Sequence, residues 1–173
     1  MLTIEDSAVM MDEVSRFTYI HSNLSYLLDE KRSFDPETKE FDQHILSVAF
    51  PRAKKYNDIM TDHQGKPVGV EFRRKDSESF AFVVPDNSGE GRYRVQMFDE
   101  NGFSGHSTEE NLEAAVEEMV NNGFRVLATG KLDELQETRK FQAGTQVASL
   151  IGKLNCGEIS HLQFVQLRDA LYA

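Results

Sequence analysis

Three short runs between Val68 and Met97 place an apolar side chain at every second position. The runs 68–74, 80–84 and 92–97 therefore have the period of half-buried strands, whose alternate side chains point to opposite faces of a sheet. Turn-forming residues separate the runs, and Asn101-Gly102 predicts another tight turn before a short strand at 103–105. The pattern predicts an antiparallel sheet of three to five strands.

The apolar spacing then changes to three and four, which is typical of a helix. Ser107 is expected to cap its first turn, with Glu110 completing a capping box. Gly123 is a stop signal, and 124–129 alternates as a strand that rejoins the sheet. The apolar face of this helix is formed by Leu112, Ala115, Val116, Met119 and Val120. Residues 68–130 are therefore expected to form an α+β core, with one amphipathic helix packed on the sheet.

A long helix is expected at the N-terminus, capped by Thr3. Its apolar residues follow a heptad spacing that covers fewer than three heptads. Such a short run serves either packing within one protomer or contact between two copies, and we favour a homodimer in which the run meets its own copy. The residues of this N-terminal seam are Met10, Val14, Phe17, His21, Leu24 and Leu28.

A second helix is expected from Asp35, with Pro36 at its first helical position. The segment 45–50 fits a strand equally well, and Pro51 is expected to interrupt either element before a further short helix. The inward-facing residues are expected to be Phe41, Ile45 and Val48, followed in the short helix by Ala53, Tyr56, Ile59 and Met60. These elements make up a helical arm at 1–67.

The C-terminal segment, 131–173, has the apolar spacing of helices. A charged helix is expected at 131–141, with an interruption at Gly144. Two amphipathic helices follow, and Ser160 with Gln163 forms a capping box for the second. Their apolar faces are formed by Val147, Leu150, Ile151 and Leu154, and by Phe164, Leu167 and Leu171. This helical hairpin is too small to fold alone, so it needs a surface on which to dock.

Two segments resemble known families. The hairpin has the pattern Leu150-x3-Leu154-x2-Gly157-x-Ile159-Ser160-x2-Gln163-Phe164-x2-Leu167-Arg168-x2-Leu171. In its Gly-x-Ile-Ser turn followed by an amide residue and Phe, the segment 146–171 resembles the short C-terminal hairpin known as the SHOCT domain. This resemblance implies an oligomerisation or docking element. Residues 68–129, with Phe-Asp-Glu-Asn-Gly-Phe-Ser-Gly-His at 98–106 before an acidic helix, resemble small accessory domains encoded by plasmids and prophages.

Charge and composition limit the classes of partner that the chain is expected to bind. The chain of 173 residues has a formal net charge of −10, which opposes non-specific attraction to phosphate. Residues 51–98 carry 9 basic and 7 acidic side chains, whereas 99–130 carry 1 and 7, so the strands are mildly basic and the helix is acidic. A single cysteine, an acidic N-terminus and the lack of a long apolar run predict a cytoplasmic protein without a membrane segment.

The sequence predicts no catalytic, metal-binding or cofactor-binding residues. His106 could meet an anion beside the expected helix start, but no nucleophile or second base accompanies it, and an exposed loop residue is the simpler interpretation. Cys156 and His161 supply two ligands where zinc needs three or four. The protein is therefore expected not to be an enzyme, with an enzyme of unrecognised type as the alternative.

Strand alternation suggests a basic surface on the sheet. Alternation within the strands places four arginines on the face opposite Phe72, Phe80 and Phe82, with Phe98 as the aromatic side chain that could point outward. Proteins that bind single strands usually stack bases on aromatic residues of the binding face, so nucleic-acid binding is expected to be weak. The residues of this alternative site are Arg73, Arg92, Arg94 and Arg125.

An acidic helix face is the other candidate binding surface. It could imitate a row of DNA phosphates, as in inhibitors of the antirestriction or anti-CRISPR type, or it could be an ordinary solvated face. Its residues are Glu109, Glu110, Glu113, Glu117 and Glu118. The leading prediction is a small acidic cytoplasmic interaction or regulatory protein that binds a protein partner and comes from a mobile element.

Overall fold

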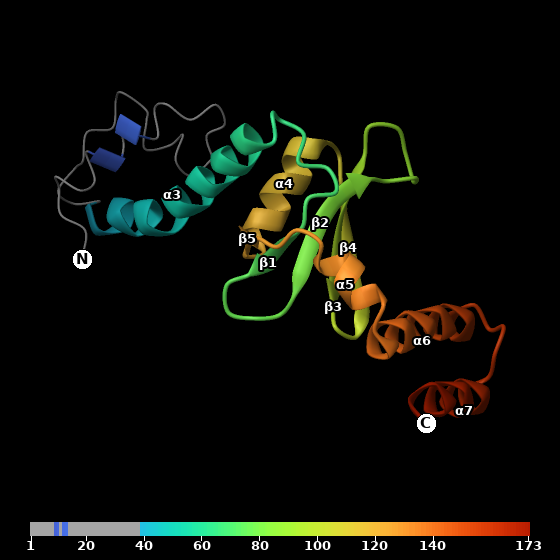
Figure 1. Cartoon of the computed structure of the whole chain (residues 1–173). Coiled ribbons are helices and arrows are strands. Elements are labelled where there is room, and N and C mark those ends of the chain that lie inside the picture. The colour runs from blue at the N-terminus through green and yellow to red at the C-terminus, as the bar shows by residue number, and fades with distance from the viewer. Residues whose placement is uncertain (1–8, 11, 14–38) are drawn as a thin grey trace. The chain divides into compact units, whose positions relative to one another are not determined.

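The computed structural model describes residues 9, 10, 12, 13 and 39–173. The chain divides into two compact units, 1–67 and 68–173. The first contains α3 (Lys39–Asp62); the second contains β1 (Phe72–Arg74), β2 (Phe80–Pro85), β3 (Tyr93–Asp99), β4 (Gly102–Glu109), α4 (Leu112–Asn121), β5 (Phe124–Leu127), α5 (Lys131–Gln136), α6 (Arg139–Asn155) and α7 (His161–Tyr172) (Figure 1). Among the described helices, none has the length and apolar content that crossing a membrane requires.

The predicted α+β fold is confirmed. The five strands form one antiparallel sheet in the order β4-β3-β2-β1-β5. All five residues predicted for the apolar face of α4 are buried. The helix stops where predicted, with Asn122 as its C-cap and Gly123 at a φ of 89°. Strand β5 then returns beside β1, so α4 and the sheet bury one another's apolar side chains.

The predicted start of α4 is wrong. Ser107 lies in β4, where its partner across the sheet is Val95, and β4 continues to Glu109. The N-cap is Asn111, whose side-chain oxygen accepts a hydrogen bond of 2.8 Å from the amide of Ala114. The sequence of β4 is almost entirely polar and small, so it lacks the apolar alternation that would have marked a long strand.

Strand β1 is shorter than the predicted run 68–74. It begins at Phe72, because Gly69 adopts a φ of 75° and breaks the extended backbone. Val68 makes only an isolated parallel bridge to Val83. The entry to the sheet is therefore a turn that rests on β2, and not a long first strand.

The second face of the sheet carries a core cluster that was not predicted. Phe80 and Phe98 stack with their ring centroids 5.3 Å apart and pack against Leu135 of α5 and Phe141 of α6. The side chain of Glu71 caps α5, because its Oε2 atom accepts hydrogen bonds from the amides of Lys131 (2.6 Å) and Leu132 (3.1 Å). These contacts place α5 and the first turns of α6 on the face opposite α4 (Figure 1).

Gly144 does not interrupt the helix, as the sequence had predicted, but lies inside α6. A Cβ atom added there would lie 1.5 Å from the carbonyl oxygen of Asn101, so only glycine lets the helix touch the β3–β4 turn. The next residue, Gly102, begins β4, and a Cβ added there would lie 2.9 Å from the backbone nitrogen of Thr145. The two glycines thus hold α6 directly against the sheet.

Pro51 also lies within a helix, which corrects the predicted break. α3 runs through it, because buried residues continue at helical spacing on both sides of the proline. The predicted inward face before Pro51 is wrong by about one residue, since Phe41 is 57% exposed and Val48 40%. The buried apolar residues are Leu46, Ala49, Phe50, Ala53, Tyr56 and Ile59, of which the last three were predicted. Met60, also predicted to face inward, is only partly buried.

Most of the N-terminal seam lies outside the described residues. Val14, Phe17, His21, Leu24 and Leu28 belong to this group, and only Met10 falls on a described helical position. Nearby, the carboxylate of Glu13 forms an ion pair with Lys54 of α3. The homodimer through this seam therefore stays a prediction.

Candidate functional site

The C-terminal helical hairpin is the element that the sequence and the structure describe in the same way. α6 ends at Asn155, with Cys156 as its C-cap. α7 begins after Ser160, whose hydroxyl accepts a hydrogen bond of 3.3 Å from the amide of Gln163. The side chain of Gln163 accepts a bond of 2.9 Å from the Ser160 amide in return. The predicted capping box is therefore confirmed, and it fixes the direction in which α7 leaves the turn.

The first turns of α6, which lead into the hairpin, are anchored on the sheet. Phe141 is buried in the cluster with Phe80 and meets the Phe103 ring edge-on at a centroid distance of 5.4 Å. Thr138 caps α6 by accepting a hydrogen bond from the Phe141 amide, and Lys140 pairs with Glu100 of the β3–β4 turn. Only the first turns of α6 take part, because its buried residues are Phe141 and Ala143.

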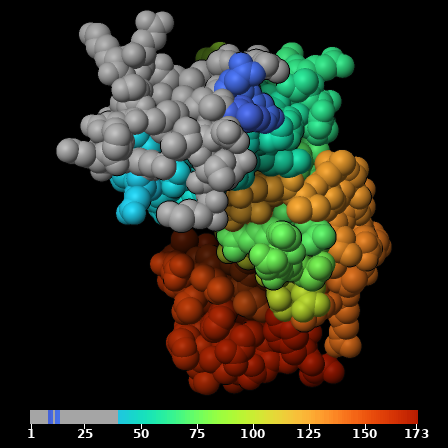
Figure 2. Space-filling model, turned by 90° about the vertical axis from the view of Figure 1, so that its left-hand side faces the viewer, coloured from blue at the N-terminus to red at the C-terminus, as the bar shows by residue number. Residues whose placement is uncertain are grey.

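The remainder of the hairpin leaves apolar side chains exposed. α7 has no buried residue, although all of its positions are described. The exposed fraction is 44% for Ile151 in α6 and, in α7, 67% for Leu162, 46% for Leu167 and 58% for Tyr172. Figure 2 shows α6 and α7, coloured red, as a continuous part of the molecular surface. Leu162, Leu167 and Tyr172 are successively five positions apart, so they lie on different sides of α7 and leave apolar surface uncovered on each of them.

A shallow groove separates the two helices of the hairpin. Its volume is about 220 Å³. Its lining combines leucines with short polar side chains and one lysine: Gln146, Ser149, Leu150, Lys153, Leu167 and Leu171. α6 and α7 therefore touch without closing a core of their own, as expected for a hairpin that needs a docking surface.

The hairpin is electrically neutral within an acidic chain. Residues 146–173 contain two basic side chains, Lys153 and Arg168, and two acidic ones, Glu158 and Asp169. The whole chain has a formal net charge of −10, so all of this excess lies outside the hairpin. An apolar partner surface can approach the hairpin without strong attraction or repulsion from its charges.

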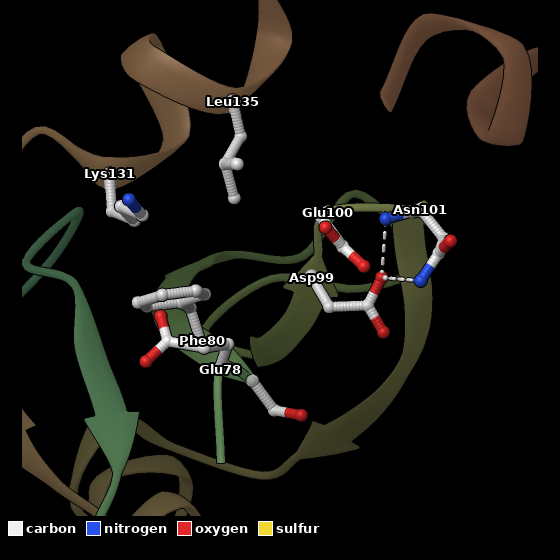
Figure 3. Close-up of a pocket in the computed structure, with 8 residues that line it drawn as sticks. Glu78, Phe80, Asp99, Glu100, Asn101, Lys131 and Leu135 are labelled. Atoms are coloured by element: carbon white, nitrogen blue, oxygen red, sulfur yellow. Dashed lines mark hydrogen bonds between the residues drawn. The ribbon is translucent and has the colours of Figure 1, made fainter. Parts of the chain in front are cut away.

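A cleft of about 360 Å³ lies between α5 and the turns at one end of the sheet. Figure 3 shows Lys131 and Leu135 of α5 facing Phe80, with the carboxylates of Glu78, Asp99 and Glu100 around the opening. The ammonium nitrogen of Lys131 lies 5.9 Å from the centroid of the Phe80 ring. The cleft is thus mostly acidic, with one cation above an aromatic floor.

Most charged groups of this cleft already have structural contacts. Asp99 Oδ1 accepts hydrogen bonds from the backbone and side-chain nitrogens of Asn101, at 2.7 and 3.1 Å (Figure 3). Glu100 pairs with Lys140, and Lys131 pairs with Glu134. Within the described part of the chain, no group of three His, Cys, Asp or Glu residues could hold a metal ion. The charged groups of this cleft therefore serve mainly to join α5 to the sheet.

The four arginines of the predicted basic surface do not share one face. Arg73 pairs across the sheet with Phe80, and Arg94 with Val84, so both lie on the face of Phe80 and Phe82, the reverse of the predicted parity. Arg125 donates a hydrogen bond of 2.9 Å from its Nε atom to the carbonyl oxygen of Val120 at the end of α4. The arginines of the expected site therefore lie on different surfaces of the sheet unit.

The remaining members of that expected surface also differ from the prediction. Arg92 is exposed in the turn before β3, at the end of the sheet that holds the β2–β3 connection. Phe98, expected to point outward, has an exposed fraction of 0% because α5 and α6 cover it. The arginines and the aromatic side chains therefore do not form the continuous exposed face that single-strand binding requires.

Arg94 has a structural partner in Asp86. Its Nε atom lies 2.8 Å from Oδ2 of Asp86, whose side chain is only 5% exposed. Hydrogen bonds from Ser88 and the guanidinium of Arg94 lower the pKa of Asp86 well below its ordinary value. Asp86 was not among the predicted residues, although its Pro-Asp-Asn-Ser-Gly context is typical of a turn in which Asp accepts from the residue two positions on.

The five glutamates of the predicted acidic face do not all lie on the helix. Glu113, Glu117 and Glu118 belong to α4, whereas Glu109 ends β4 and Glu110 lies in the bend that follows. The side chain of Glu118 accepts a hydrogen bond of 2.7 Å from Asn122. The DNA-mimic reading stays a prediction, with three of its five residues on one helix.

The remaining sequence candidates lie apart from these surfaces. His106 is exposed in β4 opposite Gln96, and not in a loop as expected. Cys156 is exposed at the end of α6, and the His161 ring lies beside Phe164 at a centroid distance of 6.4 Å. No family model, curated protein or solved structure matches the chain. The site that combines defined geometry with exposed apolar surface is the hairpin.

Proposed function

We propose that this protein is an interaction protein and that its C-terminal hairpin, residues 146–172, is the binding element. The observation that carries the proposal is the exposure of α7, which has no buried residue although a complete capping box begins it. Burying one large apolar side chain contributes about 1.5–3 kcal/mol. Covering Leu162 and Leu167 together with Ile151 would therefore stabilise the hairpin substantially.

The partner that fits this surface best is a second copy of the chain. Two copies with a net charge of −10 each repel one another, but their hairpins carry no net charge and can meet without that cost. Two hairpins pack as a four-helix bundle, in which each apolar face meets the others around a common core. A two-fold axis makes this contact self-complementary and closed.

The resemblance of residues 146–171 to the SHOCT domain supports the same use, because it implies an oligomerisation or docking element. A cytoplasmic regulatory protein of a mobile element is the corresponding biological role. In that role the dimer holds two copies of the sheet unit, so each of the other surfaces of the unit is available to partners twice. The N-terminal seam is a second, separate prediction of how two copies meet.

The oligomeric state of the full-length protein tests the proposal. Light scattering at micromolar concentration is expected to give the mass of a dimer. Replacing both leucines, Leu162→Glu and Leu167→Glu, is expected to give a monomer, because carboxylates would replace the apolar side chains that contact the second copy. Circular dichroism is expected to show that this variant keeps the helix and sheet content of the parent, since both leucines are exposed in the single chain.

Leu127→Glu is the matched control. Leu127 is 56% exposed on β5 and lies outside the hairpin, so the control adds the same charge to another exposed leucine. The control is expected to stay dimeric. A monomeric parent protein would overturn the proposal, and so would a dimer that the paired hairpin substitutions leave intact.

A further inference from the structure

A second cleft has a basic lining, in contrast to the acidic chain around it. It lies where the β1–β2 turn meets the turn between α4 and β5, and its volume is about 530 Å³. Sites for small ligands commonly occupy roughly 300–1,000 Å³, so the cleft has room for a molecule of nucleotide size. Its lining contains three cations and one carboxylate: Arg74, Lys75, Asp76, Ser77, Gly123, Arg125 and Val126.

The two arginines of this cleft are held in position by the fold. Arg74 donates from Nε to the carbonyl oxygen of Asn122 at 2.9 Å, and its guanidinium carbon lies 4.6 Å from the centroid of the Phe124 ring. Arg125 donates from Nε to the carbonyl oxygen of Val120 at 2.9 Å. Both acceptors belong to the C-terminal end of α4, where the helix dipole favours cations. A guanidinium fixed in this way loses little conformational freedom when it binds an anion.

Other polar groups of the cleft have no partner in the described part of the chain. The two terminal NH₂ groups of Arg74 make no hydrogen bond or ion pair there, and neither do Lys75 Nζ and Ser77 Oγ. The carboxylate of Asp76 forms no ion pair with the neighbouring cations. The cleft is therefore lined both by arginines that the fold holds in place and by donors that have no partner.

We propose that this cleft binds the phosphate groups of a small phosphorylated ligand of nucleotide size. Phosphate oxygens accept several charge-assisted hydrogen bonds at once, and the paired N–H groups of arginine match their spacing. Lys75 adds a mobile point charge, and the Ser77 hydroxyl adds a neutral donor. Neighbouring phosphates distribute their charge over all three cations, so a diphosphate is a better ligand than a single carboxylate. This site is independent of the hairpin and of its partner.

Pyrophosphate titration of the full-length protein, followed by amide NMR shifts, tests the site. Saturable shifts are expected at 74–77 and 123–125. Lys75→Glu is expected to weaken binding by about tenfold or more, which corresponds to about 1.4 kcal/mol for a lost charge-assisted contact. Its fold is expected to be unchanged, because the side chain of Lys75 is exposed and forms no hydrogen bond or ion pair with the described residues. The matched control, Arg92→Glu, reverses a charge in the turn at the other end of the sheet and is expected to alter affinity by less than about twofold.

Four outcomes would decide against the site. The first is the lack of saturable shifts in the parent protein, and the second is equal affinity of the parent and Lys75→Glu for pyrophosphate. The third is citrate binding as tightly as pyrophosphate, which would indicate a general carboxylate site. A single-stranded oligonucleotide that binds more tightly as its length increases would replace the small ligand by a nucleic acid and overturn the proposal. Weaker binding of inorganic phosphate than of pyrophosphate supports it.

Discussion

α4 and α7 have the same sequence signals but very different burial. Each is opened by a side chain that accepts a hydrogen bond from the third helical residue, Asn111 for α4 and Ser160 for α7. Each has apolar residues at helical spacing. Five of the ten residues of α4 are buried against the sheet, whereas none of the twelve residues of α7 is buried. The apolar face of α4 is thus covered by the sheet of the same chain, whereas no part of the chain covers α7 to the same extent.

This difference shows which properties of a helix are set locally. Caps and apolar spacing decide that both segments are helical, because they act within one or two turns. Burial depends on which surface the chain brings near. The part of α6 after Thr145 resembles α7 in its burial. The contacts that anchor α6 on the sheet end at Thr145, beside the β3–β4 turn.

The largest effect is expected from Val116→Asp in α4. Val116 has an exposed fraction of 0%, so the substitution buries an unpaired carboxylate and is expected to lower the free energy of unfolding by about 3 kcal/mol or more. Leu162→Asp makes a comparable change on α7 and is expected to cost less than about 0.5 kcal/mol in dilute solution. Urea denaturation of both variants measures the difference. Similar losses at the two sites would remove the contrast between the helices.

Gly144→Ala is expected to weaken the point where the hairpin meets the sheet. The added Cβ would collide with the Asn101 carbonyl, and relieving such a collision costs about 1–3 kcal/mol. Gly152→Ala is the matched control in the same helix, because a Cβ there has no neighbour within 4 Å. The control is expected to stabilise the protein by about 0.5–1 kcal/mol. If Gly144→Ala were also stabilising, the close contact between α6 and the turn would not exist.

Asp86→Asn tests how much the ion pair with Arg94 and the hydrogen bond from Ser88 contribute to the stability of the sheet unit. The pKa of Asp86 is lowered in the folded state by Ser88 and Arg94, so the unfolded state takes up a proton first as the pH falls. The stabilisation from the carboxylate is therefore complete above roughly pH 5 and decreases as the pH falls through the ordinary Asp value of about 3.9. The parent is expected to exceed the variant in stability at neutral pH, with the gap closing in acid. A gap independent of pH would contradict this role.

Glu71→Ala is expected to have the smallest effect, on the element that leads to the hairpin. Loss of the carboxylate removes the cap of α5, which costs about 1 kcal/mol. The amides of Lys131 and Leu132 are expected to exchange faster with solvent, while those of α4 keep their protection. Glu71→Gln keeps an acceptor and is expected to lose less. Equal protection of the two amides in the parent and Glu71→Ala would show that the bond is dispensable.

The sequence predicts those parts of the fold that depend on neighbouring residues. The buried face of α4 follows from its spacing, and the capping box at Ser160 from two residues three positions apart. Alternation within β2 and β3 marked both as strands. It could not show which face of one strand continues onto the next, because register depends on pairing, and so Phe80 was assigned to the wrong side relative to Arg73.

Other features depend on contacts distant in sequence. Gly144 resembles a helix breaker until the Asn101 carbonyl is seen beside it. The cap that Glu71 provides joins residues 60 positions apart. The basic cleft joins the turn after β1 to the turn after α4, so Arg74 and Lys75 carried no recognisable signal alone. Of the exposed apolar residues of the hairpin, Ile151 and Leu167 belong to the predicted apolar faces, whereas Leu162 and Tyr172 do not.

Hydrogen exchange at low and high protein concentration tests most directly whether a second copy covers the hairpin. The amides of α7 and of the distal part of α6 are expected to gain protection as concentration rises, because association buries both helices. The amides of α4, already packed on the sheet, are expected to exchange at the same rate throughout. Exchange in α7 that is equally fast at every concentration would contradict the account.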